Sequence, residues 1–139
     1  MSPIRVPVEE FTTPDPVTAG PDMSIDELRR LMDAHGIRHL PVVRDGAVVG
    51  LVSDRDVRLA MGLDDDRRQL LTAADIMAGE PVSVGAHRPL EEVAFLMSER
   101  KVGSVIVNDA DGGLVGIFTA TDALNALIEI IRGGGRPGA

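Results

Sequence analysis

Apolar residues recur at helical spacing from Ile25 to Met32, directly after a polar start signal. They lie three or four positions apart and mark one face of a helix: Ile25, Leu28, Leu31 and Met32. Ser24 and Glu27 have the spacing of a capping box, in which each side chain bonds a free backbone N–H at the helix start. We therefore predict a helix that begins after Ser24 and ends near Gly36.

The pattern then changes to two short runs rich in β-branched residues. Residues 39–43 and 47–52 flank the turn Arg44-Asp45-Gly46, which predicts a β-hairpin. Ser53 opens a second predicted helix that reaches about Met61. With a short extended piece at residues 16–19, the predicted order is β-α-β-β-α.

The whole unit occurs twice. A shift of 65 residues places Pro16-Val17 on Pro81-Val82, and after one inserted residue Ser53-x-x-Asp56 falls on Thr119-x-x-Asp122. The second copy has extended residues 82–84, strands at 104–108 and 113–118, and helices at 89–100 and 119–131. A unit of about 50 residues covers too little apolar surface to be stable alone. We therefore expect an α+β protein in which the two repeats pack with pseudo-twofold symmetry.

The repeats also predict the boundaries along the chain. We place the first repeat at residues 8–62, a linker at 63–74, the second repeat at 75–131 and a frayed, Gly/Pro-rich tail at 132–139. Residues 62–68 are interpreted as an exposed connector. Thr72 is predicted to cap a short helical turn before the second repeat.

Composition and charge exclude several classes of function. The chain has 139 residues, a net charge of −8 and no cysteine. The negative charge argues against nucleic-acid binding, and the missing thiol removes disulfides, Cys-type zinc sites and thiolate catalysis. No nucleophile–base set or phosphate-binding loop is present, so we do not expect an enzyme. No signal peptide or membrane-length apolar run is visible, so we expect a cytoplasmic protein without membrane contact.

Several motifs at matching positions in both repeats resemble the CBS domain. They are Leu40-Pro-Val-Val43, Asp75-Ile-Met77 before Pro81-Val82, and the pair Gly50-Leu-Val-Ser-Asp-Arg-Asp56 and Gly116-Ile-Phe-Thr-Ala-Thr-Asp122. Residues 8–131 as a whole are similar to a tandem CBS pair, or Bateman module. The resemblance implies a stand-alone regulatory module that binds AMP, ADP or ATP, with NAD and S-adenosylmethionine as further candidates. It also implies no covalent cofactor, homodimerisation and an unknown effector protein.

In the resembling family, each nucleotide site combines residues of both repeats. One implied site joins Thr119 and Asp122 to Thr18, Arg38 and His39. The other joins Ser53, Arg55 and Asp56 to Ser83, Gly103 and Ser104. A hydroxyl at a helix N-terminus suits a phosphate, and the following aspartate can accept hydrogen bonds from both ribose hydroxyls. Gly50 and Gly116 leave room for a ligand or for neighbouring backbone.

Plainer interpretations exist for the same residues. Ser53-x-x-Asp56 and Thr119-x-x-Asp122 are also helix-capping patterns, and Arg38 and His39 could be solvated strand residues. The alternative function is a scaffold module whose clefts hold no ligand. The last helix is apolar around most of its circumference, so on either interpretation we expect a homodimer.

Overall fold

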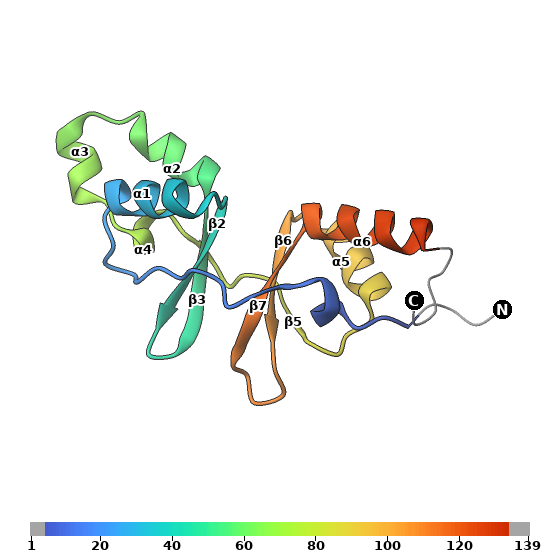
Figure 1. Cartoon of the computed structure of the whole chain (residues 1–139). Coiled ribbons are helices and arrows are strands. Elements are labelled where there is room, and N and C mark those ends of the chain that lie inside the picture. Colours follow the sequence, from blue (N-terminus) through green and yellow to red (C-terminus); the bar gives the residue numbers. More distant parts are fainter. Residues whose placement is uncertain (1–4, 134–139) are drawn as a thin grey trace. The chain divides into compact units, whose positions relative to one another are not determined.

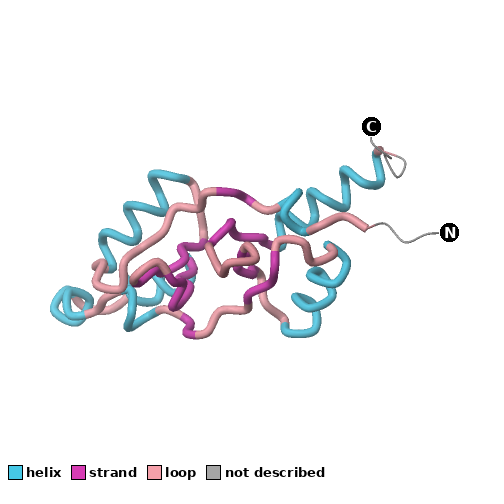
Figure 2. Tube along the Cα trace, turned by 90° about the horizontal axis from the view of Figure 1, so that it is seen from below, coloured by secondary structure: helices cyan, strands magenta, loops and turns pink. Residues whose placement is uncertain are grey.

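Two compact units make up the part of the chain that the computed structural model describes, residues 5–133 (Figure 1). Unit 2 is Pro16–Pro81, and unit 1 consists of the described residues on either side of it, 5–15 and 82–133. Each unit contains both helices and strands, as the colouring in Figure 2 shows. The predicted tail falls outside the described residues from residue 134 onward.

Unit 2 carries a three-stranded antiparallel sheet in the order β2-β3-β4. Its elements are α1 (Ile25–His35), β2 (His39–Arg44), β3 (Ala47–Ser53), α2 (Asp54–Met61), α3 (Asp65–Leu70), α4 (Ala73–Ile76) and β4 (Ala78–Gly79). The predicted first strand is reduced to one parallel bridge from Ala19 to Val42. The core consists of apolar residues from α1, both long strands and α2: Ile25, Leu28, Leu40, Val42, Val52 and Val57.

Local signals in the sequence account for the ends of α1. Ser24 and Glu27 form the predicted capping box, and Gly36 closes the helix in the left-handed conformation with φ of 62°. Glycine adopts this conformation without a steric penalty.

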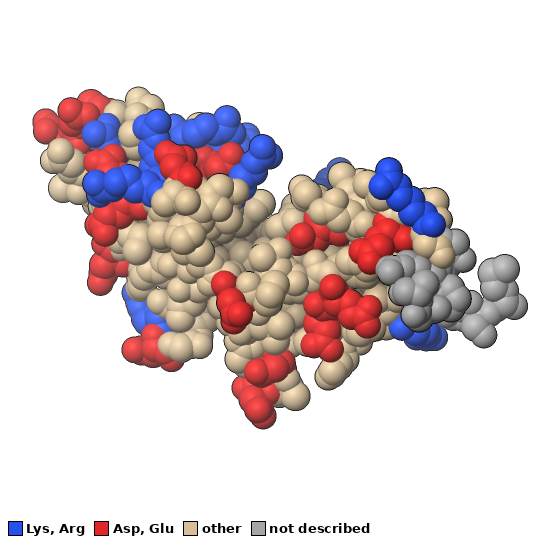
Figure 3. Space-filling view, viewed as in Figure 1, with Lys and Arg blue, Asp and Glu red and all other residues tan. Residues whose placement is uncertain are grey.

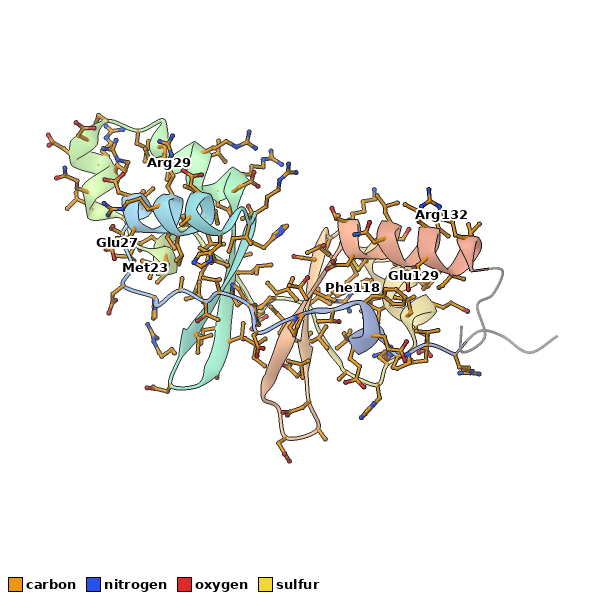
Figure 4. The ribbon with its side chains drawn as sticks, viewed as in Figure 1. Met23, Glu27, Arg29, Phe118, Glu129 and Arg132 are labelled. Carbon is orange, nitrogen blue, oxygen red and sulfur yellow. The ribbon has the colours of Figure 1, made fainter. Side chains whose placement is uncertain are left out.

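Unit 1 carries a four-stranded sheet in the order β1-β7-β6-β5. Its elements are η1 (Val8–Phe11), β1 (Thr13–Pro14), β5 (Ser83–Gly85), α5 (Leu90–Arg100), β6 (Ser104–Asn108), β7 (Leu114–Thr119) and α6 (Ala120–Arg132). Phe118, labelled in Figure 4, is fully buried in its core. The predicted α+β class with two β-α-β-β-α repeats is confirmed.

The segment that leads into each repeat belongs to the unit of the other repeat. Thr13 and Pro14 of β1 pair with Ile117 and Gly116 in β7. In the same way, Ala78 and Gly79 of β4 pair with Leu51 and Gly50 in β3. The chain therefore passes between the units twice, near residues 15 and 81, and the compact units differ from the sequence repeats. The predicted repeat boundaries themselves remain a prediction.

Residues 62–68 are more ordered than the exposed connector that the sequence predicts. Asp64 caps α3 by accepting a hydrogen bond from Arg67 N at 2.9 Å. The side chain of Arg68 is only 16% exposed and forms ion pairs with Asp65 at 2.9 Å and Asp26 at 3.2 Å. The latter approach is too poorly aligned for a hydrogen bond from Arg68 Nε. The Arg68 guanidinium nevertheless links α3 to α1. The acidic sequence of this segment does not indicate such a contact.

No helix within residues 5–133 combines the length and the apolar character needed to cross a membrane.

Candidate functional site

The polar residues predicted for the site lie where each hairpin ends and the following helix begins. In unit 2, Ser53 Oγ accepts a hydrogen bond from Asp56 N at 3.2 Å, and Asp56 Oδ2 accepts one from Ser53 N at 2.9 Å. In unit 1, Asp122 Oδ2 accepts from Thr119 N at 2.8 Å and from its hydroxyl at 3.0 Å. The capping interpretation is therefore confirmed at both positions.

Capping leaves part of each aspartate available for another partner. Both caps use the Oδ2 atoms of Asp56 and Asp122, so neither cap requires the second oxygen, Oδ1. A carboxylate oxygen can accept more than one hydrogen bond. Capping and recognition of a diol such as ribose are therefore compatible at the same residue.

The start of the preceding strand lies beside each capped helix. His39 is opposite Ser53 in the β2–β3 register, and Asp54 N donates to the carbonyl of Arg38 at 2.8 Å. Unit 1 repeats the arrangement, since Ser104 is opposite Thr119. The corresponding backbone bond runs from Ala120 N to the carbonyl of Gly103 at 2.9 Å. The same cluster of strand start and helix start therefore occurs once in each unit.

Thr18 and Ser83 lie on the extended segments that run beside these strands. The neighbour of Thr18, Ala19, donates its N–H to Pro41 at 2.9 Å, and Ser83 is the first residue of β5, paired in parallel with Ile106. Both Thr18 and Ser83 are exposed.

Each site predicted from the sequence draws residues from both units. Unit 2 holds Thr18, Arg38, His39, Ser53, Arg55 and Asp56. Unit 1 holds Ser83, Gly103, Ser104, Thr119 and Asp122. Within each unit, the structure thus brings together the residues that the unit contributes to the two predicted sites. That residues of unit 1 and unit 2 combine into each site remains a prediction.

Gly50 and Gly116 are needed for packing within each unit. A Cβ added to Gly50 would meet the Met77 sulfur at 2.2 Å, and one added to Gly116 would meet the Thr13 carbonyl oxygen at 2.1 Å. The space beside both glycines is therefore taken by the leading segments. Neighbouring backbone, one of the two occupants predicted from the sequence, lies beside Gly116, and a side chain lies beside Gly50.

A cavity of about 630 Å³ between α1 and α2 was not predicted from the sequence. Its charged lining residues come from both helices and from the residue just before β2: Arg29, Asp33, Arg38, Asp54 and Arg58. Arginine side chains gather over these helices in Figure 3, with carboxylates among them. The spacing of apolar residues in α1 predicts which face of that helix is buried. The cavity, however, depends on how α2 packs against α1.

The titration of His39 is shifted by its surroundings. Burial of the imidazole is the largest cause and lowers its pKa below the ordinary value of 6.5. The charges of Asp54 and Asp56 oppose this shift, whereas Arg38 adds to it. The neutral form is therefore favoured in the folded protein.

This shift predicts a pH dependence of stability. As the pH falls below about 6.5, the unfolded chain binds a proton at His39 before the folded chain does, so the free energy of unfolding should decrease. His39→Gln should remove part of that decrease in denaturant titrations between pH 7.5 and 5. His35→Gln, an exposed change on α1, serves as the control. Identical pH profiles for wild type and His39→Gln would contradict the assignment.

The sequence profile of the CBS domain matches residues 8–62 and 73–129. The chain belongs to the CBS domain family, and its two matches make it a tandem CBS pair.

Two kinds of protein are similar to this chain in sequence. The chain is 32% identical to a CBS domain-containing protein of Dictyostelium discoideum, DDB_G0289609, over 93% of this chain and 96% of that protein. It is also 36% identical to inosine-5'-monophosphate dehydrogenase of Korarchaeum cryptofilum, over 82% of this chain but only 23% of the dehydrogenase. The chain therefore spans about a quarter of the length of that enzyme.

Two solved structures have the same fold and hold adenosine compounds. CBSX2 of Arabidopsis thaliana, crystallised with AMP, has a TM-score of 0.77 and 30% identity over 91% of this chain and 98% of its own. The CBS pair of protein MJ0100, crystallised with 5-methylthioadenosine and S-adenosyl-L-methionine, has a TM-score of 0.78 and 27% identity. That similarity covers 96% of this chain and all of the other.

Proposed function

We propose that this CBS pair is a regulatory, non-catalytic module that binds an adenosine-containing nucleotide and signals to a separate protein. AMP, ADP and ATP are the primary candidates, with NAD and S-adenosylmethionine as further ones. The observation that carries the proposal is the capped aspartate of each repeat, whose Oδ1 is not needed by its cap. The adenosine ligands of CBSX2 and MJ0100 support it.

In the proposed arrangement, the aspartate accepts the ribose hydroxyls while the helix N-terminus faces the phosphate. Charge-assisted hydrogen bonds of this kind are about twice as strong as neutral ones. The site of Thr119 and Asp122 takes Thr18, Arg38 and His39 from the other repeat. The site of Ser53, Arg55 and Asp56 takes Ser83, Gly103 and Ser104. The first has the better complement for an anion, because it contains both Arg38 and His39.

Thermal unfolding with AMP tests the proposal directly. A ligand at about 100 times its Kd adds about 2.7 kcal/mol to the stability of the folded state, so AMP should raise the Tm by several degrees. Titration calorimetry against adenosine, AMP, ATP, NAD and S-adenosylmethionine then identifies the preferred ligand. No change in Tm and no heat with any of these compounds would favour the scaffold function instead.

The contribution of Arg38 and His39 is tested by the double change to alanine. Two donors near a phosphate dianion contribute about 1.5–3 kcal/mol each, so wild type should bind AMP far more tightly than adenosine. The double variant should bind the two compounds about equally in calorimetry. A preference for AMP that survives the double change would place the phosphate elsewhere.

We also propose that the module is a homodimer. Four large apolar side chains of α6 are exposed in the described chain: Leu124, Leu127, Ile128 and Ile131. Exposed apolar clusters of this kind mark protein interfaces. Sedimentation equilibrium should give about twice the 14.7 kDa of one chain at micromolar concentration, and a monomer would contradict the proposal.

A further inference from the structure

The α1–α2 cavity of unit 2 has the size and the lining of a small-molecule site. Its volume of about 630 Å³ lies within the range of roughly 300–1,000 Å³ that such sites occupy. Four apolar side chains form part of its lining: Met32, Ile37, Val57 and Met61. An apolar lining with a few convergent polar groups is the usual composition of a ligand pocket.

Three arginines line the same cavity, and their donors are free. Arg29, labelled in Figure 4, approaches Asp33 only to 3.8 Å. Arg58 approaches Asp54 only to 4.0 Å, and both distances are too long for a hydrogen bond. The side chain of Arg38 has no ion pair or hydrogen bond to another residue of the described chain. Exposed ion pairs of such length add little stability, so all three guanidinium groups are available to an anion.

The chemistry of the lining indicates the class of ligand. Three arginines and two aspartates give the cavity a positive excess in a chain whose net charge is −8. Arginine pairs with carboxylates and phosphates through two parallel hydrogen bonds. The sulfur atoms of methionines such as Met32 and Met61 make favourable contacts with aromatic rings. A small anion with an aromatic body therefore fits both kinds of lining residue.

The corresponding cavity of unit 1 lacks these arginines. The 65-residue shift places Arg29 on Ala94, and after the inserted residue Arg58 falls on Leu124. Ala94 and Leu124 both line the cavity between α5 and α6, where Glu91 is the only charged residue of the lining. The repeat thus folds without a positive charge at either position. The arginines of unit 2 are therefore not required by the fold.

We propose that the α1–α2 cavity binds a small aromatic anion, an aryl carboxylate or an aryl phosphate, whose charge is held by Arg29 and Arg58. This inference goes beyond nucleotide binding and does not rest on it, because neither proposed nucleotide site contains these two arginines. Arg38 is shared with one of those sites and is left unchanged in the tests. An anion bound here would contact both α1 and α2 and give the module a second input besides the nucleotide.

Methyl NMR of the full chain, labelled at its methionines, tests the site with 1-naphthoate and 1-naphthyl phosphate as probes. Ring currents of the naphthyl group should shift the signals of Met32 and Met61 in a saturable manner. Met97 occupies the position in unit 1 that Met32 occupies in unit 2, so its signal is the internal control and should not move. Signals of Met32 and Met61 that stay in place at millimolar probe, or that move together with Met97, would overturn the proposal.

Two double variants test the role of the arginines. Arg29→Gln with Arg58→Gln should weaken both probes about tenfold or more, because each guanidinium donates charge-assisted hydrogen bonds. Arg30→Gln with Arg67→Gln removes the same charge from exposed positions that do not line the cavity and should keep the wild-type affinity. Neutral 1-naphthol should bind all three proteins equally. Equal losses of affinity for the anions in the two double variants would overturn the proposal.

The choice of probes also identifies the anionic group. Tighter binding of 1-naphthyl phosphate assigns the site to phosphate esters, and tighter binding of 1-naphthoate assigns it to carboxylates. The side chains of Arg29 and Arg58 are 57% and 75% exposed, so their replacement should leave the Tm unchanged. A loss of probe binding at an unchanged Tm then reports on the site rather than on the fold.

The nucleotide proposal and the anion proposal fail separately. Saturating AMP should leave the Kd of both probes unchanged, because the two kinds of site use different residues. Displacement of the probes by AMP would overturn the separate anion site. If AMP does not bind at all, the nucleotide proposal fails, and the shifts of Met32 and Met61 still decide whether the anion site exists.

Discussion

Gly116→Ala should destabilise the protein by about 3 kcal/mol, at the upper end of the usual effect of overpacking. The added methyl group would stand 2.1 Å from the Thr13 carbonyl oxygen. Because that atom belongs to backbone, β1 would have to leave its place beside β7, where Thr13 and Pro14 pair. Differential scanning calorimetry should show a fall in Tm of about 10 °C.

Two other glycines provide the comparison. Gly50→Ala meets the side chain of Met77, from its sulfur to its Cβ, rather than backbone, so this side chain can shift and the loss should be smaller, about 1 kcal/mol. Gly85→Ala in β5 meets nothing within 4 Å and should change the Tm little. Equal Tm values for all three variants would contradict the close contact between β1 and β7 at Gly116.

Asp122→Ala should weaken AMP binding by about 10- to 150-fold. Removing a charged acceptor of the ribose hydroxyls costs about 1.5–3 kcal/mol of binding free energy. Asp56→Ala should have the smaller effect, because its proposed site lacks a counterpart of Arg38 and His39. Calorimetric titration well below the Tm separates this effect from the loss of the cap, which costs about 1 kcal/mol of stability.

Another capping box with an aspartate offers a matched control for Asp122. Thr72 and Asp75 cap α4 with the same bonds, at 2.8 Å from Thr72 N and 3.1 Å from its hydroxyl, but lie outside both proposed sites. Asp75→Ala should lose a cap and keep its affinity for AMP. If it loses as much affinity as Asp122→Ala, the aspartates act only through the stability of their helices.

The sequence predicts those features whose causes are local. A capping box lies within four residues, so it can be recognised in the sequence. Two helix starts are predicted in this way, by Ser24 with Glu27 and by Thr119 with Asp122. The Asp45-Gly46 turn likewise fixes its hairpin, with Asp45 and Gly46 both at positive φ. These signals predict the caps and the strand starts beside them, whereas the assignment of these residues to a nucleotide site comes from the resemblance to the CBS domain.

Other features depend on contacts between distant parts of the chain. β1 is only Thr13–Pro14, which is too short for an alternating pattern, and its partner lies about a hundred residues away. The order in α3 depends on Arg68 reaching Asp26 in α1. The cavity of unit 2 depends on the packing of α2 on α1. None of these has a periodic signal that a single sequence displays.

The two repeats exchange their leading segments within one chain, in the way that two chains exchange strands in a domain-swapped dimer. A break in the loop near Leu63 would leave one fragment with η1 and β1, which unit 1 requires, and another with α4 and β4, which unit 2 requires. Neither fragment could complete its own sheet, but together they would hold each other as an interlocked pair. Within one chain, the exchanged segments meet their sheets at a far higher effective concentration than they would as parts of two separate fragments.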